Sequence, residues 1–172
     1  MSVTLPESVD AWRMVSARRS FQGKLPIAAM RRLGEALADT KGEAQYELDF
    51  GRDEFGTAYL DVRVQAPLSL ICQRSLEPFV LPVTLDSRLG LIRHEREESA
   101  LPPGSEPLLV AEDGKLSLAD VIEDELLLVL PLVPVNPDST LPDEVVASPA
   151  DEPTAGEGRT HNPFAILREL KK

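Results

Sequence analysis

The sequence predicts an α+β fold in which a mostly antiparallel, barrel-like sheet carries two N-terminal helices and one long helix, followed by a disordered acidic linker and a short C-terminal helix. Three observations lead to this prediction. Apolar and polar residues alternate in several runs between residues 46 and 85, which is the period of a strand. Apolar residues recur at three- and four-residue spacing in residues 27–37 and 118–130, which is the period of a helix. Residues 136–161 are rich in proline and acid and hold no aromatic residue.

Two short helices are expected near the N-terminus. Ser8 can cap a helix over residues 9–18, with Asp10 in its first turn, where the helix dipole favours negative charge. Pro26 suits the first position of a second helix, and Gly42 can end it. The apolar stripe of this second helix consists of Ile27, Met30, Leu33 and Leu37.

The middle of the chain is expected to form the sheet. Residues 21–23 are extended or turning chain, and the alternating runs then predict strands at residues 46–50, 60–72, 79–85, 89–93 and 108–110. Pro67 lies within the second of these strands and has no N–H to donate. It therefore requires a bulge or an edge position.

A long helix is expected over residues 118–130. Ser117 and Asp120 resemble a capping box at its start, and Pro131 stops it. Its apolar surface is wide, which favours a central core helix or a helix at an interface. Glu123, Asp124 and Glu125 follow one another on this helix, so their side chains point about 100° apart and do not converge on one metal ion. We interpret them as a solvated helix face, with metal-dependent hydrolysis as the rival interpretation.

The chain is expected to divide into a folded domain at residues 1–135, a linker at 136–161 and a terminal helix at 162–172. The linker cannot bury enough apolar surface to offset the entropy cost of ordering. In the terminal helix, Phe164, Leu167 and Leu170 share one face and are the candidate partner-binding residues. The alternative is that this helix folds back onto its own domain.

Charge is distributed unevenly along the chain. The net charge of -11 repels nucleic acid at long range, so that any contact with nucleic acid must be local. Six basic residues lie between positions 13 and 32 with no acidic residue among them, and these candidates for RNA binding are Arg13, Arg18, Arg19, Lys24, Arg31 and Arg32. The alternative is an ordinary solvated surface that balances the acidic half of the molecule.

No catalytic residue, metal or cofactor is predicted. The chain has neither a phosphate-binding loop nor a dinucleotide fingerprint, and Cys72, His94 and His161 are too few for a Cys/His zinc cage. Cys72 is expected to be a small buried hydrophobe, with a nucleophilic or redox role aided by Arg74 as the alternative. The longest apolar run, at residues 126–135, is half of the roughly 20 residues that a membrane span needs. We expect a cytoplasmic protein without a membrane segment.

Four segments together resemble one family, the bacterial YceD proteins, which are large ribosomal RNA subunit accumulation proteins. The segments are ARRSFQG, LICQRSLEPF, VIEDELLLVLPLVPV and NPFAILRELKK, and they extend over nearly the whole chain. Many members of the family carry a CxxC or CxRC motif where this chain has Cys72 and Ser75. The resemblance therefore implies no metal or redox role for this pair.

The resemblance implies a non-enzymatic cytoplasmic factor for the synthesis, processing or stability of 23S rRNA. Its expected partner is 23S rRNA or a precursor, contacted directly or through a large-subunit ribosomal protein, with ribosomal protein L32 as a candidate. A second hypothesis is that the acidic half holds a basic large-subunit ribosomal protein away from RNA until assembly, as a protein-only adaptor or chaperone.

Overall fold

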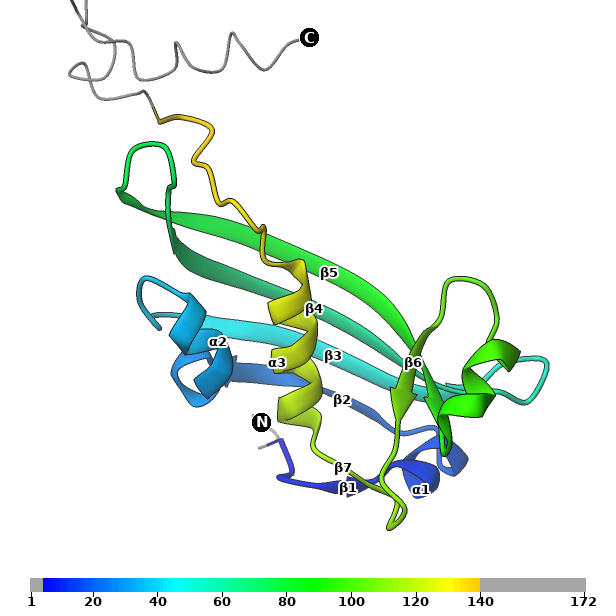
Figure 1. Cartoon of the computed structure of the whole chain (residues 1–172). Coiled ribbons are helices and arrows are strands. Elements are labelled where there is room, and N and C mark those ends of the chain that lie inside the picture. The colour runs from blue at the N-terminus through cyan, green and yellow to red at the C-terminus, as the bar shows by residue number, and fades with distance from the viewer. Residues whose placement is uncertain (1–4, 140–172) are drawn as a thin grey trace, which may run out of the picture. The chain divides into compact units, whose positions relative to one another are not determined.

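The computed structural model describes residues 5–139, and the centre of this part is a five-stranded sheet in the order β2-β3-β4-β5-β6 (Figure 1). The strands are β2 (Ser20–Pro26), β3 (Glu43–Arg52), β4 (Ala58–Ile71), β5 (Pro78–Ile92) and β6 (Glu106–Leu109). Strands β2 to β5 are antiparallel to their neighbours, whereas β6 runs parallel to β5. The sheet is mostly antiparallel as predicted. Because β2 and β6 lie at opposite edges, it is not closed into a barrel.

The central hairpin confirms the alternation seen in the sequence. Leu48 of β3 lies opposite Val62 of β4, and both are fully buried. Pro67 of β4 lies beyond Gln65, the last β4 residue paired with β3, so its missing N–H falls where β4 has no β3 neighbour. The prediction of a separate strand at residues 89–93 is wrong, because β5 continues through this stretch as far as Ile92.

The first helix is shorter than predicted. Helix α1 (Ala11–Ser16) is capped by Asp10, whose Oδ1 accepts a hydrogen bond from Arg13 N at 3.0 Å. The expected cap, Ser8, lies outside the helix because strand β1 (Val9–Asp10) pairs with β7 (Lys115–Leu116). A tertiary contact thus determines where the helix begins.

The second helix is also shorter than predicted. A 3₁₀ turn, η1 (Ile27–Ala29), precedes helix α2 (Arg31–Ala36), and the chain is extended again at Leu37. The reason is a contact with β4, because Ala38 N donates to Ser69 O at 2.8 Å and Asp39 forms a bridge with Ser69.

Helix α3 (Leu118–Val129) lies over one face of the sheet, as Figure 1 shows. Ser117 Oγ accepts from Asp120 N at 3.3 Å, which confirms the predicted cap, and the chain leaves the helix at Leu130 before Pro131. The residues of α3 that are buried against the sheet include Leu118, Ile122 and Leu126. Helix α3 is therefore a core helix. A second 3₁₀ segment, η2 (Glu95–Ala100), connects β5 to β6.

The chain divides into units at residues 1–140 and 141–172, and the second unit lies outside the described residues. Phe164, Leu167, Leu170 and most of the predicted linker are in that part. Of the helices between residues 5 and 139, none has the length and apolar character needed to cross a membrane.

Candidate functional site

The register of the sheet separates two faces of different chemistry. Residues that lie opposite each other on paired strands point to the same side, so that Tyr46, Val64 and Leu85 lie on the face under α3 and are buried. Their neighbours in sequence point to the other side, which we call the open face. The uncharged polar side chains of the open face include Gln22, Gln45, Gln65 and Thr84, and these four are exposed.

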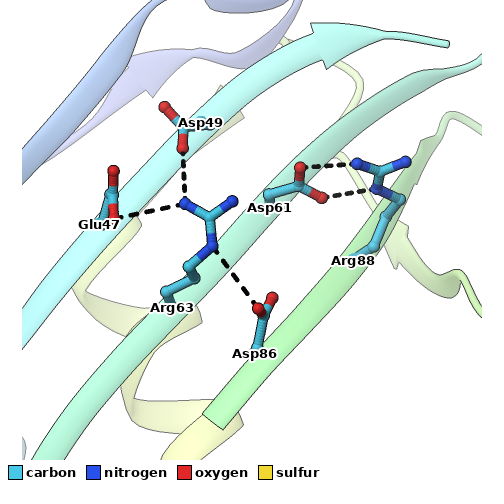
Figure 2. A network of polar contacts seen from close by, with 6 residues as sticks. All are labelled: Glu47, Asp49, Asp61, Arg63, Asp86 and Arg88. Carbon is cyan, nitrogen blue, oxygen red and sulfur yellow. Dashed lines mark hydrogen bonds and ion pairs between the residues drawn. The ribbon is translucent and has the colours of Figure 1, made fainter.

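A network of charges occupies the open face (Figure 2). Arg63 of β4 lies between carboxylates from both neighbouring strands. Its Nη1 is 3.3 Å from an oxygen of Glu47 and 3.3 Å from an oxygen of Asp49, both on β3, and its Nε is 3.6 Å from an oxygen of Asp86 on β5. Hydrogen bonding to Glu47, with the charges of Asp86 and Asp49, raises the pKa of Arg63. One guanidinium is thus shared by three carboxylates.

A second pair completes the network. Arg88 of β5 binds Asp61 of β4 with two hydrogen bonds, from Nε at 2.6 Å and from Nη2 at 2.7 Å (Figure 2). The Asp61 side chain is only 13% exposed, and the hydrogen bond to it raises the pKa of Arg88. The guanidinium also lies 4.3 Å from the centre of the Tyr59 ring. The Tyr59 ring packs over Gly51, so closely that a Cβ at position 51 would lie 2.5 Å from ring atom Cζ. Arg88 is therefore held both by Asp61 and by the face of the Tyr59 ring.

The open face carries an excess of negative charge. Its charged side chains are Lys24, Glu43, Glu47, Asp49, Asp61, Arg63, Asp86 and Arg88, which amounts to five acidic and three basic residues. A hollow of about 620 Å³ lies over its centre, lined by Gln22, Lys24, Glu47, Arg63 and Asp86 among others. Between residues 5 and 139, no group of three His, Cys, Asp or Glu residues is arranged to hold a metal ion. The chemistry of this face suits charge recognition.

The predicted basic cluster is divided by the fold. Arg32 pairs with Glu123 and Asp124, Lys24 lies 3.4 Å from Glu43, and Arg31 lies 3.5 Å from Glu35. The other three candidates, Arg13, Arg18 and Arg19, are exposed and form no ion pair within residues 5–139. Half of the cluster is therefore neutralised by the chain's own carboxylates.

The interpretation of Glu123 as part of a solvated helix face is wrong. Glu123 is 5% exposed, and its Oε1 accepts the Leu33 N–H at 2.9 Å near the start of α2. Its Oε2 accepts from Arg32 Nε at 3.1 Å and lies 3.0 Å from Nη2. Hydrogen bonds to Asp124 and Glu123 raise the pKa of Arg32. Glu123 therefore joins α3 to the first turn of α2, where backbone N–H groups lack partners within the helix.

The carboxylate of Glu125 makes a contact of its own. Ser87 of β5 donates a hydrogen bond to Glu125 Oε2 at 2.5 Å. Partial burial raises the pKa of Glu125, and the Ser87 hydrogen bond opposes this effect. The three consecutive acidic residues of α3 thus hold the helix to α2 on one side and to β5 on the other.

Trp12 lines a second hollow together with Arg13, one of the three arginines without an ion pair among the described residues. The guanidinium of Arg93 lies 4.5 Å from the centre of the Trp12 ring. Arg13 and His94 line the same hollow of about 600 Å³, together with Asp10, Glu112 and Asp113. The hollow is thus of mixed charge. The sequence alone does not predict that Arg93 belongs to this hollow, because Arg93 is 81 positions from Trp12 and no local pattern connects the two residues.

Cys72 lies in a corner formed by the β4–β5 turn and the chain after α3. It is fully buried, which confirms the expected burial, but its surroundings are polar. Its Sγ is 3.4 Å from Ser139 Oγ and accepts hydrogen bonds from the N–H groups of Ser75 and Asn136, each at 3.4 Å. Burial raises the pKa of the thiol, but these hydrogen bonds outweigh burial and lower it to about 6.

Arg74 secures the same corner. Its Nε donates to Ser139 Oγ and its Nη2 donates to Asn136 O, each at 2.9 Å. The arginine therefore holds the first residues after 135 against the β4–β5 turn. These contacts involve the first residues of the segment at 136–161 that the sequence predicts to be a linker.

Sequence reasoning missed the residues of the open face. Their signal was the polar half of each alternating strand, in which Glu47, Asp49, Asp61, Arg63 and Asp86 recur at every second position. The alternation shows that these side chains share a face. It does not show that α3 covers the opposite face and leaves this one open.

Comparison with known proteins gives two matches of wide coverage. A family model described as "Large ribosomal RNA subunit accumulation protein YceD" matches residues 60–171. A protein of Haemophilus influenzae with the name Large ribosomal RNA subunit accumulation protein YceD is 28% identical over 182 residues, which cover 99% of this chain and 98% of that protein. No solved structure matches the chain.

Proposed function

The chain belongs to the YceD family, and from this membership we propose that it promotes the accumulation of 23S rRNA of the large ribosomal subunit in the cytoplasm. The observation that carries the proposal is the nearly full-length match to a protein named for this role. The chain acts by binding and not by catalysis. Two features support this: the carboxylates of the open face are held in ion pairs, and Cys72 is buried.

Direct RNA contact is proposed for Arg13, Arg18 and Arg19. These three are the candidates without an ion pair among the described residues, and cationic side chains supply the part of RNA affinity that does not depend on sequence. Trp12 and Arg93 lie at the same hollow as Arg13 and offer stacking surfaces for a base. Arg32 is withdrawn from this role because its guanidinium holds Glu123 and Asp124.

The test is complementation of a strain that lacks this chain. We expect the triple variant Arg13→Glu, Arg18→Glu, Arg19→Glu to leave the level of 23S rRNA low relative to 16S rRNA, whereas the wild type restores it. Cross-linking in the same cells should show loss of 23S rRNA from the variant. The control reverses Lys41, Arg96 and Lys115, which are also exposed. Lys41 and Lys115 form only exposed ion pairs, with Asp39 and Asp113, and this variant should complement fully. Full complementation by both variants would contradict direct contact through these arginines.

A second candidate function is that of an adaptor or chaperone for a basic large-subunit ribosomal protein, with ribosomal protein L32 as a candidate from the family resemblance. The excess of carboxylates on the open face favours it. Salt-dependent binding of the purified chain to the basic protein, with no binding to rRNA, would select this function.

We further propose that residues 136–161 act as a linker and that residues 162–172 carry a partner-binding helix. The sequence supports this through the proline and acid content of the first segment and through Phe164, Leu167 and Leu170 in the second. The proposed helix is short and would order on contact with a surface.

A further inference from the structure

We infer that the open face of the sheet binds a basic segment of another protein, with an arginine or lysine side chain entering between Glu47, Asp49 and Asp86. This inference deepens the adaptor function proposed above and rests on it for its biological meaning. The binding itself is argued from the charge, the shape and the exposure of the face.

The charge argument begins with Arg63. Three carboxylates surround this one guanidinium, at 3.3 Å, 3.3 Å and 3.6 Å, which leaves a local charge of minus two. These carboxylates come from strands on both sides of β4, so the sheet fixes their spacing. A second cation placed over the group would gain attraction from all three carboxylates, against repulsion from Arg63 and from Lys24, which lines the same hollow and lies 3.4 Å from Glu43. Within residues 5–139, the three carboxylates are therefore incompletely neutralised.

The shape argument concerns the hollow of about 620 Å³ beside this cluster. Gln22, Gln45 and Gln65 come from three adjacent strands and point to the open face, where their amides can both donate and accept hydrogen bonds. A polypeptide backbone needs both kinds of partner. The hollow thus offers backbone recognition next to a site for a cationic side chain.

Among residues 5–139, the segments outside the sheet cover the open face only at one end. The Leu101 side chain packs over Gly90 of β5, and a Cβ at position 90 would lie 2.5 Å from Leu101 Cδ2. The central side chains, including Glu47, Arg63 and Asp86, remain exposed. Among residues 5–139, the helices therefore leave this part of the sheet without a partner.

The same charges disfavour RNA on this face. Phosphate groups would be repelled by Glu47, Asp49 and Asp86, and Arg63 is already engaged by all three. Basic extensions of proteins carry the opposite charge and gain both affinity and association rate from such a face. The occupant that fits is a basic polypeptide segment.

The test uses the purified full chain and a fluorescent peptide of four Arg-Gly-Gln repeats, followed by fluorescence anisotropy. The same peptide with citrulline in place of arginine keeps the shape without the charge. The variant Glu47→Gln, Asp49→Asn, Asp86→Asn should bind the arginine peptide about tenfold more weakly, because three partly exposed ion pairs are lost together. The control Glu54→Gln, Glu95→Gln, Glu98→Gln makes the same change in net charge at exposed positions that do not line the 620 Å³ hollow. It should change the affinity less than about twofold.

Arg63→Gln gives a test of opposite sign. Removal of the competing guanidinium should tighten peptide binding by about two- to threefold, whereas a face that binds RNA would lose affinity for a uridine dodecamer. The proposal is overturned if the face and control variants bind the arginine peptide equally, or if the citrulline peptide binds as well. It is also overturned if the peptide binds only after Arg168, Lys171 and Lys172 are changed to Gln, because the chain's own tail would then be the occupant.

The cellular measurement separates this inference from the proposed function. If the face variant loses peptide binding and also fails to restore 23S rRNA, both proposals are supported together. If no variant affects peptide binding but the wild type restores 23S rRNA, the inference fails while the proposed function stands. Failure of the wild type to restore 23S rRNA would remove the proposed function, and the peptide assay would still decide the inference.

Discussion

Truncation of Glu123 should destabilise the folded chain, whereas replacement of its exposed neighbour Asp124 should not. Glu123→Ala removes the acceptor of the Leu33 N–H, a 2.9 Å hydrogen bond in a buried place near the start of α2. A buried donor left without a partner costs about 1–3 kcal/mol, and a charged acceptor lies in the upper part of this range. We expect a loss of about 2 kcal/mol in the free energy of unfolding, which corresponds to a Tm lower by roughly 6 °C.

Two further variants divide the effect. Glu123→Gln keeps an amide oxygen that can accept from Leu33 N but loses the ion pair with Arg32, so it should cost about half as much as Glu123→Ala. Asp124→Asn is the matched control. Its side chain is 54% exposed, and its one ion pair among residues 5–139 is with Arg32, so the unfolding curve should remain close to that of the wild type.

Urea unfolding followed by fluorescence is a suitable assay, because Trp12 is the single tryptophan of the chain and packs partly against the core. Equal curves for Glu123→Ala and the wild type would refute the role of Glu123 in holding α2. A Glu123→Gln variant that has normal stability but does not restore 23S rRNA would instead indicate a functional role for the Glu123 carboxylate.

Three other predictions concern separate parts of the chain. Hydrogen bonds lower the pKa of Cys72 to about 6 in the folded chain, below that of a thiol in the unfolded chain, so ionisation of Cys72 stabilises the fold. This stabilisation should grow as the pH rises from about 6 towards 8 and disappear as the pH falls below about 6. The difference in unfolding free energy between the wild type and Cys72→Ser, measured in urea, should follow this trend. Asp61→Asn breaks the paired hydrogen bonds with Arg88 and should cost about 1 kcal/mol in unfolding free energy. Deletion of residues 162–172 should leave the Tm nearly unchanged and lower 23S rRNA in the complementation assay, whereas a large drop in Tm would place this segment in the core.

The sheet and the long helix could be predicted because their signals are local. Alternation in residues 46–50 and 60–66 reflects burial of one face, and the Ser117 cap with Pro131 bounds α3. The N-terminal helices could not be bounded in this way. Apolar spacing continues to Leu37, but a backbone hydrogen bond from Ala38 to Ser69 holds the chain extended, and this tertiary contact outweighs helix propensity.

The candidate site shows a similar limit. A count of basic residues between positions 13 and 32 predicts a cluster, but the carboxylates that neutralise Arg32 lie 91 and 92 positions away. The sequence contains these acidic residues as a group on one helix. Which way that helix faces is determined only when α3 packs on the sheet.

Packing of α3 on one face gives the chain's charges two different roles. On the covered face, Glu123 and Arg32 hold helices together, and their replacement changes stability first. On the open face, Glu47 and Asp86 are exposed, and their replacement should change binding with little change in stability. Reversal of all basic residues from Arg13 to Arg32 would therefore confuse unfolding with loss of RNA contact. Only variants confined to the exposed, unpaired residues can assign a binding role, and the Tm of each variant shows whether that condition is met.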